Sequence, residues 1–228
     1  MTISRNPLIV AADVSDLDQA ERLVRRLRGR IAFAKVGLEL FTAAGPDAVI
    51  RIRSLVPVFL DLKLHDIPTT VGRAARNAGR LGAALLTVHA QGGIQMVEAA
   101  VQGADAGAAE AGVERPGVLG VTVLSSQAGN GAASPAALAS EAVGAGAAGV
   151  VVSGEDVRAV REAIGPGPVV VVPGIRPGGS SNDDQVRVLT PVEALELGAD
   201  YVVVGRPVTQ ATDPAAAAEE ILREAGAA

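Results

Sequence analysis

The sequence predicts an α/β fold, a single (β/α)8 (TIM) barrel, and three observations support this prediction. Eight short apolar runs rich in β-branched residues alternate with longer amphipathic stretches. The apolar runs are continuous and do not alternate with polar residues, as expected for parallel strands that are buried on both faces. The length of 228 residues is usual for an α/β barrel that forms one domain. We therefore expect one domain over residues 1–228.

The predicted strands and helices follow one another in a regular order. The eight strands are expected at residues 8–12, 31–36, 58–62, 84–89, 117–123, 149–152, 169–172 and 201–204. The helices are expected at residues 16–28, 46–55, 70–81, 94–109, 135–145, 155–164, 191–197 and 214–225. Asp16 is expected to cap the first helix, and four others start near a proline, which the first helical turn tolerates: Pro46, Pro135, Pro191 and Pro214.

The main alternative fold is an open, doubly wound sheet. Such a sheet commonly carries a Gly-x-Gly-x-x-Gly turn after its first strand, and no such turn follows residues 8–12. Eight units of strand and helix are also the number that closes a barrel. We interpret the alanine- and glycine-rich stretches at residues 103–112 and 128–149 as helix surfaces and connections, because the strand pattern resumes directly after each.

Composition and charge argue against several classes of protein. The net charge of −5 disfavours a broad basic surface for nucleic acid or anionic membranes, and aromatic residues, at 2%, are too few for base stacking. Cysteine is absent, so no disulfide can form, and this suits a reducing compartment. The first apolar run ends at Asp13, too early for a signal peptide or for the roughly 20 apolar residues of a membrane span. We therefore expect a cytoplasmic protein without nucleic-acid or membrane partners.

The two lysines of the chain stand out because its other basic side chains, histidines apart, are all arginines. A solvated surface charge can be either residue, but only lysine readily gives up and regains a proton. Codon bias is the alternative explanation. Lys35 and Lys63, however, both fall at the carboxyl end of an expected strand, where barrel enzymes carry their chemistry.

Further charged residues end the same strands. Strand alternation puts Asp61 and Lys63 on one side of the chain, facing the barrel mouth. Asp13 and Lys35 lie at the carboxyl ends of neighbouring strands. A buried ion pair adds little stability compared with apolar packing, so several charges gathered at this face favour a functional site. Asp66 lies beyond the strand, in a loop before Pro68.

Glycine and arginine residues predict a phosphate site at the ends of the last two strands. Gly174 and Arg176 follow the seventh strand, and Gly205 and Arg206 follow the eighth. Backbone amides exposed at glycines bind anions, and arginine adds a charge-assisted hydrogen bond. The polar loop through Gln185 is long enough to act as a lid.

The two histidines receive a more modest interpretation. His89 is expected to pack or hydrogen-bond near the barrel mouth, and His65 to lie in a loop. No cluster of histidine and carboxylate residues has convincing metal-ligand spacing, although Asp61, Asp66 and His89 could form one if the loop folded inward.

Residues 59–71, with the sequence FLDLKLHDIPTTV, resemble the signature of the orotidine 5′-monophosphate decarboxylase family in its bacterial form. Further matches occur in order along nearly the whole chain: Asp13, residues 34–37 (AKVG), 88–90 (VHA), 92–93 (GG), 121–124 (VTVL), 173–177 (PGIRP), 184–185 (DQ) and 204–207 (VGRP). The sequence departs from the family at Ala12, where leucine is usual, and at Ser125, where bacterial members commonly carry threonine.

The resemblance implies decarboxylation of orotidine 5′-monophosphate to uridine 5′-monophosphate in de novo pyrimidine biosynthesis. It implies no metal or organic cofactor, and a homodimer with shared active sites. Lys63 would protonate the C6 carbanion, and the other catalytic residues implied are Asp61, Lys35 and Asp66. The implied substrate-binding residues are Asp13, Lys35, Asp61, Thr70, Ser125, Arg176, Gln185, Gly205 and Arg206.

Two other functions remain open at this point. Metal-dependent hexulose-phosphate synthases and keto-gulonate-phosphate decarboxylases resemble this chain in the Asp-x-Lys-x-x-Asp core, but Ile67, Pro68 and Thr70 favour the nucleotide enzyme. The chain could also be a catalytically silent barrel that only binds a nucleotide. The presence of both lysines and both aspartates argues against that interpretation.

Overall fold

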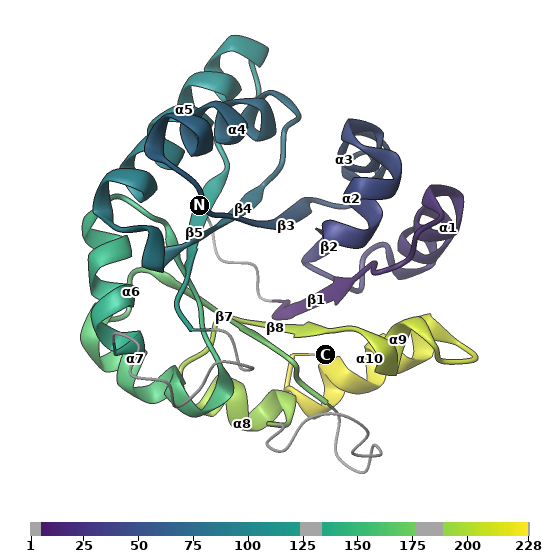
Figure 1. The fold of residues 1–228 in the computed structure, drawn as a ribbon. Coiled ribbons are helices and arrows are strands. Elements are labelled where there is room, and N and C mark those ends of the chain that lie inside the picture. The colour runs from purple at the N-terminus through teal and green to yellow at the C-terminus, as the bar shows by residue number, and fades with distance from the viewer. Residues whose placement is uncertain (1–5, 124–133, 177–188, 228) are drawn as a thin grey trace.

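The computed structural model describes residues 6–123, 134–176 and 189–227, which form a closed parallel barrel (Figure 1). Each strand pairs with the next one in sequence, and β1 pairs with β8 to close the ring. The predicted barrel is therefore confirmed, with strand ends shifted by one or two residues. The strands are β1 (Leu8–Ala11), β2 (Phe33–Gly37), β3 (Val58–Leu64), β4 (Leu85–His89), β5 (Gly117–Val121), β6 (Gly149–Val151), β7 (Val169–Pro173) and β8 (Tyr201–Val204).

The helices surround the strands as an outer layer (Figure 1). They are α1 (Leu17–Leu27), α2 (Leu38–Ala44), α3 (Pro46–Arg53), α4 (Pro68–Arg80), α5 (Ile94–Ala111), α6 (Pro135–Gly144), α7 (Val157–Ile164), α8 (Pro191–Glu196), α9 (Arg206–Thr209) and α10 (Pro214–Glu224). Short 3-10 turns at Ala90–Gly92 and Gly154–Asp156 precede α5 and α7. None of the helices in the described parts of the chain is both long and apolar enough to cross a membrane.

Local signals account for most helix starts. Asp16 caps α1 by accepting a hydrogen bond of 2.7 Å from the Gln19 amide, as expected. Prolines occupy the first turn of the four predicted helices and also of α4, which therefore begins at Pro68, two residues before the expected start. Helices α2 and α9 were not predicted from the sequence. Each follows a glycine at the carboxyl end of a strand, Gly37 as the last residue of β2 and Gly205 directly after β8, and both helices are too short to show a clear apolar period.

Two apolar layers fill the molecule. Alternate residues of β1 show the division, because Ile9 and Ala11 pack inside the barrel while Leu8 and Val10 pack against the helices. Inside the barrel, the rings of Phe33 and Tyr201 meet edge to face at 5.3 Å. On three neighbouring strands, the residue two positions after an apolar residue of this inner cluster is polar or charged: Lys35 after Phe33, Asp61 after Phe59, and Thr87 after Leu85. The barrel therefore has an apolar floor and a polar rim at the carboxyl ends of β2, β3 and β4.

At the opposite, amino-terminal end of the barrel, Arg161 on α7 ties together the segments that enter β7 and β8. Its guanidinium donates hydrogen bonds of 2.8–2.9 Å to the carbonyl oxygens of Gly165, Pro168 and Gly198, and it pairs with Asp200 at 2.6 Å. In a barrel, this end supports stability while the other end carries function. Arg161 thus secures the two strands whose far ends carry Arg176 and Arg206.

Helices α4 and α5 approach each other so closely that glycine is required between them. A Cβ atom added at Gly103 would collide with the carbonyl oxygen of Gly72, and one added at Gly107 would collide with the carbonyl oxygen of Arg76. In both cases the obstacle is backbone, which cannot rotate away as a side chain can. The close packing holds α4 and α5 directly behind β3 and β4, the strands that carry Lys63 and His89.

The α4–α5 contact generates a stability prediction for Gly107→Ala. We expect the substitution to lower the free energy of unfolding by about 1–3 kcal/mol, because the added methyl group overpacks the interface. This loss should appear although alanine is the better helix former by about 1 kcal/mol. Chemical denaturation followed by circular dichroism measures the change.

Gly144→Ala is the matched control, because Gly144 also lies in a helix but has no atom within 4 Å of an added Cβ. This variant should be as stable as the parent chain or slightly more stable. Equal stability of the two variants would mean that the α4–α5 contact tolerates a wider spacing.

Candidate active site

Four side chains of alternating charge form a continuous chain across the mouth of the barrel. Lys35 Nζ lies 2.9 Å from Asp13 Oδ1 and 3.7 Å from Asp61 Oδ2. Lys63 Nζ lies 2.8 Å from the same Asp61 oxygen. The structure therefore brings together both lysines and both aspartates, as the sequence predicted from strand ends that are far apart along the chain.

The two middle members of this charged chain are buried, and its two ends are more exposed. The side chains of Asp61 and Lys35 are only 11% and 12% exposed, that of Lys63 is 30% exposed, and that of Asp13 is 49% exposed. A buried carboxylate is tolerated only when charges and hydrogen bonds compensate it. Asp61 has two ammonium groups for this purpose. The ammonium of Lys63 is the more accessible of the two and can face a ligand in the mouth.

The backbone at Lys63 is unusual. Its φ angle is 49°, and it is the only non-glycine residue with positive φ among those that the structure describes. The pairing of β3 with β4 also shifts register between Leu60 and Leu64, around this residue. A left-handed conformation costs a non-glycine residue about 1–3 kcal/mol and is often found at functional sites. Lys63 and Asp61 meet as predicted, but an irregularity in the strand brings them together, and simple alternation is not the cause.

Thr87 on β4 contacts the charged chain from inside the barrel, and it was not among the residues predicted from the sequence. The residue is fully buried, and its hydroxyl donates a hydrogen bond of 2.9 Å to Asp61 Oδ1. The same hydroxyl accepts a hydrogen bond of 2.8 Å from the backbone amide of Lys63. The sequence gives only a weak indication that Thr87 belongs to the site. It is a single polar residue within the apolar run of β4, and threonine is common in strands.

Gly37, at the end of β2, leaves the space that the Asp13–Lys35 pair occupies. A Cβ atom at this position would lie 2.8 Å from Asp13 Oδ1 and 3.0 Å from Lys35 Nζ. Any side chain here would therefore force the ion pair to move. The residue matches the AKVG segment that resembles the family, and the structure supplies a physical reason for glycine there.

The two histidines lie beside the charged chain. Their ring centroids are 5.1 Å apart, with His65 directly after β3 and His89 at the end of β4. Burial lowers the pKa of His89, and the charges of His65 and Lys63 lower it further, while Asp61 opposes the shift. His89 is thus kept neutral near pH 7. This agrees with the interpretation of His89 as a packing residue near the mouth.

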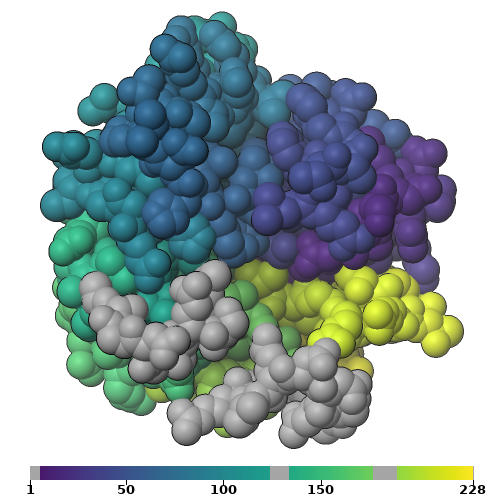
Figure 2. Space-filling model, viewed as in Figure 1, coloured from purple at the N-terminus to yellow at the C-terminus, as the bar shows by residue number. Residues whose placement is uncertain are grey.

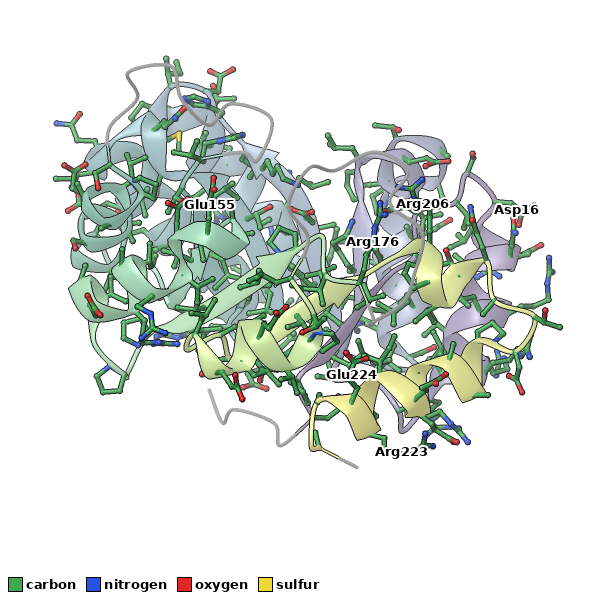
Figure 3. The ribbon with its side chains drawn as sticks, turned by 90° about the horizontal axis from the view of Figure 1, so that it is seen from below. Asp16, Glu155, Arg176, Arg206, Arg223 and Glu224 are labelled. Carbon is green, nitrogen blue, oxygen red and sulfur yellow. The ribbon has the colours of Figure 1, made fainter. Side chains whose placement is uncertain are left out.

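A second group of predicted residues follows β7 and β8. Arg176 and Arg206 lie on the same side of the molecule as Asp16, and Arg223 and Glu224 lie toward the opposite side (Figure 3). Gly205 directly follows β8, and a Cβ atom added there would approach only Ala11, at 3.8 Å. Early and late parts of the chain meet here, as the purple and yellow surfaces show (Figure 2).

The remaining predicted residues stand apart from the charged chain. Asp66 and Thr70 are exposed, and Asp66 Oδ1 accepts a hydrogen bond from the adjacent Ile67 amide. Among the described residues, no ion pair joins Asp66 to either lysine. Ser125 and Gln185 lie outside the described residues. Within the described ranges, no three histidine or carboxylate side chains are arranged to hold a metal ion.

The chain is similar to known proteins of one family over nearly its whole length. The model of a family described as "Orotidine 5'-phosphate decarboxylase / HUMPS family" matches residues 6–221. A protein of Anaeromyxobacter sp. (strain K) named orotidine 5′-phosphate decarboxylase is 52% identical over 225 residues, covering 94% of this chain and 96% of that protein. A protein of the same name from Paramagnetospirillum magneticum is 47% identical over 232 residues, covering 97% and 99%. The crystal structure of orotidine 5′-phosphate decarboxylase from Lactobacillus acidophilus superposes with a TM-score of 0.83 at 38% identity, covering 96% of this chain and 99% of that one.

The lowered pKa of His89 predicts that acid destabilises the folded chain through this residue. Below the ordinary value of 6.5, the unfolded chain takes up a proton at His89 more readily than the folded chain does. Stability that is present above pH 6.5 is therefore lost as the pH falls. We expect the unfolding temperature to fall less between pH 7.5 and pH 5.5 in His89→Asn than in the parent chain.

His65→Asn provides the comparison for this measurement. It removes one neighbouring charge but leaves the burial of His89, which is the largest cause of the shift. Its acid sensitivity should lie between those of the parent chain and His89→Asn. Identical pH profiles for the parent chain and His89→Asn would contradict the assignment.

Proposed function

The chain belongs to the orotidine 5′-phosphate decarboxylase / HUMPS family, and we propose that it converts orotidine 5′-monophosphate into uridine 5′-monophosphate and CO2. Relatives that are 47–52% identical over nearly their full length are named for this activity. We further propose a cytoplasmic enzyme of de novo pyrimidine synthesis, whose single barrel is one catalytic domain.

The observation that carries this proposal is the Asp13–Lys35–Asp61–Lys63 chain at the barrel mouth. Loss of CO2 leaves an electron pair on C6 of the pyrimidine, in the plane of the ring. The π system of the ring cannot delocalise a pair in that plane. Stabilisation must then come from a fixed charge nearby, in a site that excludes water. Lys63 supplies such a charge, because its ammonium is held by Asp61 and is the more exposed of the two lysines.

Lys63 also supplies the proton in this proposal. The bond between C6 and the carboxylate breaks, and its electron pair stays on C6. An N–H bond of the Lys63 ammonium then breaks as the proton moves to C6, and the neutral amine regains a proton from water. Arginine at this position would keep the positive charge but would not readily release the proton.

Asp61, Lys35 and Asp13 place the substrate around Lys63. Asp61 would lie beside the departing carboxylate, where it either destabilises the ground state by repulsion or holds Lys63 in position. Lys35 completes the charged network, and Lys35 and Asp13 would contact the ribose hydroxyls. Asp13 is suited to this contact because its side chain is the most exposed of the four charged side chains at the barrel mouth.

The phosphate would bind at the ends of β7 and β8. We propose that Arg206, Gly205 and Gln185 hold it, with Arg176 supporting the loop, and that Ser125 contacts the pyrimidine. Binding energy from the phosphate would then help to position the pyrimidine ring for the reaction. We propose that neither a metal ion nor an organic cofactor takes part.

The same proposal includes a homodimer with shared active sites. Three large apolar side chains are exposed near the barrel mouth, after β2, β3 and β4: Leu38 is 54% exposed, Ile67 is 66% exposed and Ile94 is 49% exposed. Exposed apolar residues gathered on one face favour an interaction surface. Asp66 and Thr70 are exposed beside Ile67, so they are available to reach the site of a second subunit.

Turnover in metal-free buffer tests the proposed function. We expect the parent chain to consume orotidine 5′-monophosphate at the same rate with and without EDTA. The loss of the substrate's absorbance measures this rate. Lys63→Ala should lose nearly all turnover but still bind uridine 5′-monophosphate, because Lys63 faces the reacting carbon and not the phosphate. Lys63→Arg should also be inactive.

Each other result points to a different conclusion. Activity that EDTA abolishes and Mg²⁺ restores would favour a metal-dependent sugar-phosphate enzyme of the same family. Binding without turnover in the parent chain would favour a silent nucleotide-binding barrel. An active Lys63→Ala variant would remove Lys63 as the proton donor.

Mixed dimers test the shared site. Asp66→Ala and Lys63→Ala should each be inactive alone, but a heterodimer of the two carries one site with both defects and one intact site. After subunit exchange, a statistical mixture should recover about a quarter of the parent activity, since half of the dimers are heterodimers with one working site each.

A mixture of Asp61→Ala with Lys63→Ala is the control, because these two residues belong to the same site of the same subunit. That mixture should recover nothing. If the Asp66→Ala mixture also stays inactive after verified exchange, Asp66 does not act across the interface.

A further inference from the structure

Thr87 differs from the other buried polar residues of the barrel. Among the described residues, three polar or charged side chains are classed as buried: Asp61, Thr87 and Thr122. The Thr122 hydroxyl donates a hydrogen bond of 3.3 Å to a backbone carbonyl, that of Val151. Thr87 instead contacts two residues of the charged site, Asp61 and Lys63, although it is itself fully buried beneath them.

The direction of both Thr87 hydrogen bonds follows from simple chemistry. A backbone amide can only donate, so the hydroxyl must accept from Lys63. The single hydroxyl proton is then left for Asp61 Oδ1, which accepts it as a carboxylate. The hydroxyl is therefore held in one orientation, as acceptor from the Lys63 amide and donor to Asp61.

Each of these bonds controls one part of the site. The bond to Oδ1 fixes the rotation of the Asp61 carboxylate, which leaves Oδ2 to face Lys63 at 2.8 Å and Lys35 at 3.7 Å. The β3–β4 register shifts around Lys63, and there the Lys63 amide donates its hydrogen bond to the Thr87 side chain instead of to a backbone carbonyl of β4. This hydrogen bond thereby stabilises the left-handed backbone at Lys63, which directs the side chain toward Asp61.

We propose that Thr87 is a positioning residue for the decarboxylation, acting through Asp61 and Lys63 at once. The inference rests on the proposed function and adds a residue to it. Thr87 does not touch the substrate in this proposal. Its hydroxyl keeps the ammonium of Lys63 at the reacting carbon, so its loss should slow the chemical step more than it weakens binding.

The test compares variants of the full-length chain with and without the hydroxyl. Thr87→Val keeps the shape and removes the hydroxyl, and Thr87→Ser keeps the hydroxyl. Thr122→Val removes a buried hydroxyl whose hydrogen bond goes to a backbone carbonyl. The measurements are kcat and KM for orotidine 5′-monophosphate, the affinity for uridine 5′-monophosphate by calorimetry, and the unfolding temperature.

We expect Thr87→Val to lower kcat by at least about tenfold, the size of effect that loss of a hydrogen bond to a charged group produces. Its affinity for uridine 5′-monophosphate should change by less than about threefold, since the phosphate contacts remain. Thr87→Ser should recover most of the kcat. Thr122→Val should lower the unfolding temperature without lowering kcat.

Other outcomes overturn the inference or its premise separately. If the parent chain is active and Thr87→Val keeps its kcat, Thr87 is only a packing residue. The same conclusion holds if Thr87→Ser loses as much kcat as Thr87→Val. A parent chain without turnover would instead refute the proposed function. If Thr87→Val does not fold, Thr87→Ala provides the second hydroxyl-free variant, with the same expected loss of kcat.

Discussion

The carboxylate of Asp61 is the group on which the site depends. It lies almost out of contact with water, where an uncompensated charge would cost several kcal/mol. The protein compensates it with two lysines on one oxygen and a buried hydroxyl on the other. Each partner is thereby constrained in turn: Lys35 is held between Asp61 and Asp13, and Lys63 takes a backbone conformation that an ordinary strand would not provide.

The closed barrel explains why these groups can meet. The carboxyl ends of all eight strands lie at one rim, so residues distant in sequence become neighbours there. Closure also makes β1 a neighbour of both β2 and β8. Gly205 at the end of β8 therefore faces Ala11, two residues before Asp13. A nucleotide that spans from the β8 end to Lys63 would pass over Asp13 and Lys35, which is where the proposal puts the ribose.

Stability and chemistry are divided between different parts of the molecule. The Arg161–Asp200 pair secures strands from the amino-terminal end of the barrel. The close contact of α4 and α5 supports strands from the outer layer. Apolar side chains fill the lumen below the charges. The rim can thus carry groups whose geometry serves the site, such as Lys63 with its left-handed backbone and the exposed Asp66. This separation is common in barrels and lets the rim vary while the scaffold stays intact.

The sequence by itself determined the fold class and most of the site. Continuous apolar runs at regular spacing fit parallel strands that are buried on both faces, and the rarity of lysine drew attention to Lys35 and Lys63. Local rules also gave the Asp16 cap and the proline helix starts, because such signals act within one turn. The tertiary structure alone decided the rest. The partners of Thr87, the left-handed φ of Lys63 and the need for glycine at Gly37 and Gly107 all arise between elements distant in sequence. No local pattern encodes them, because each depends on how closely two separate segments approach.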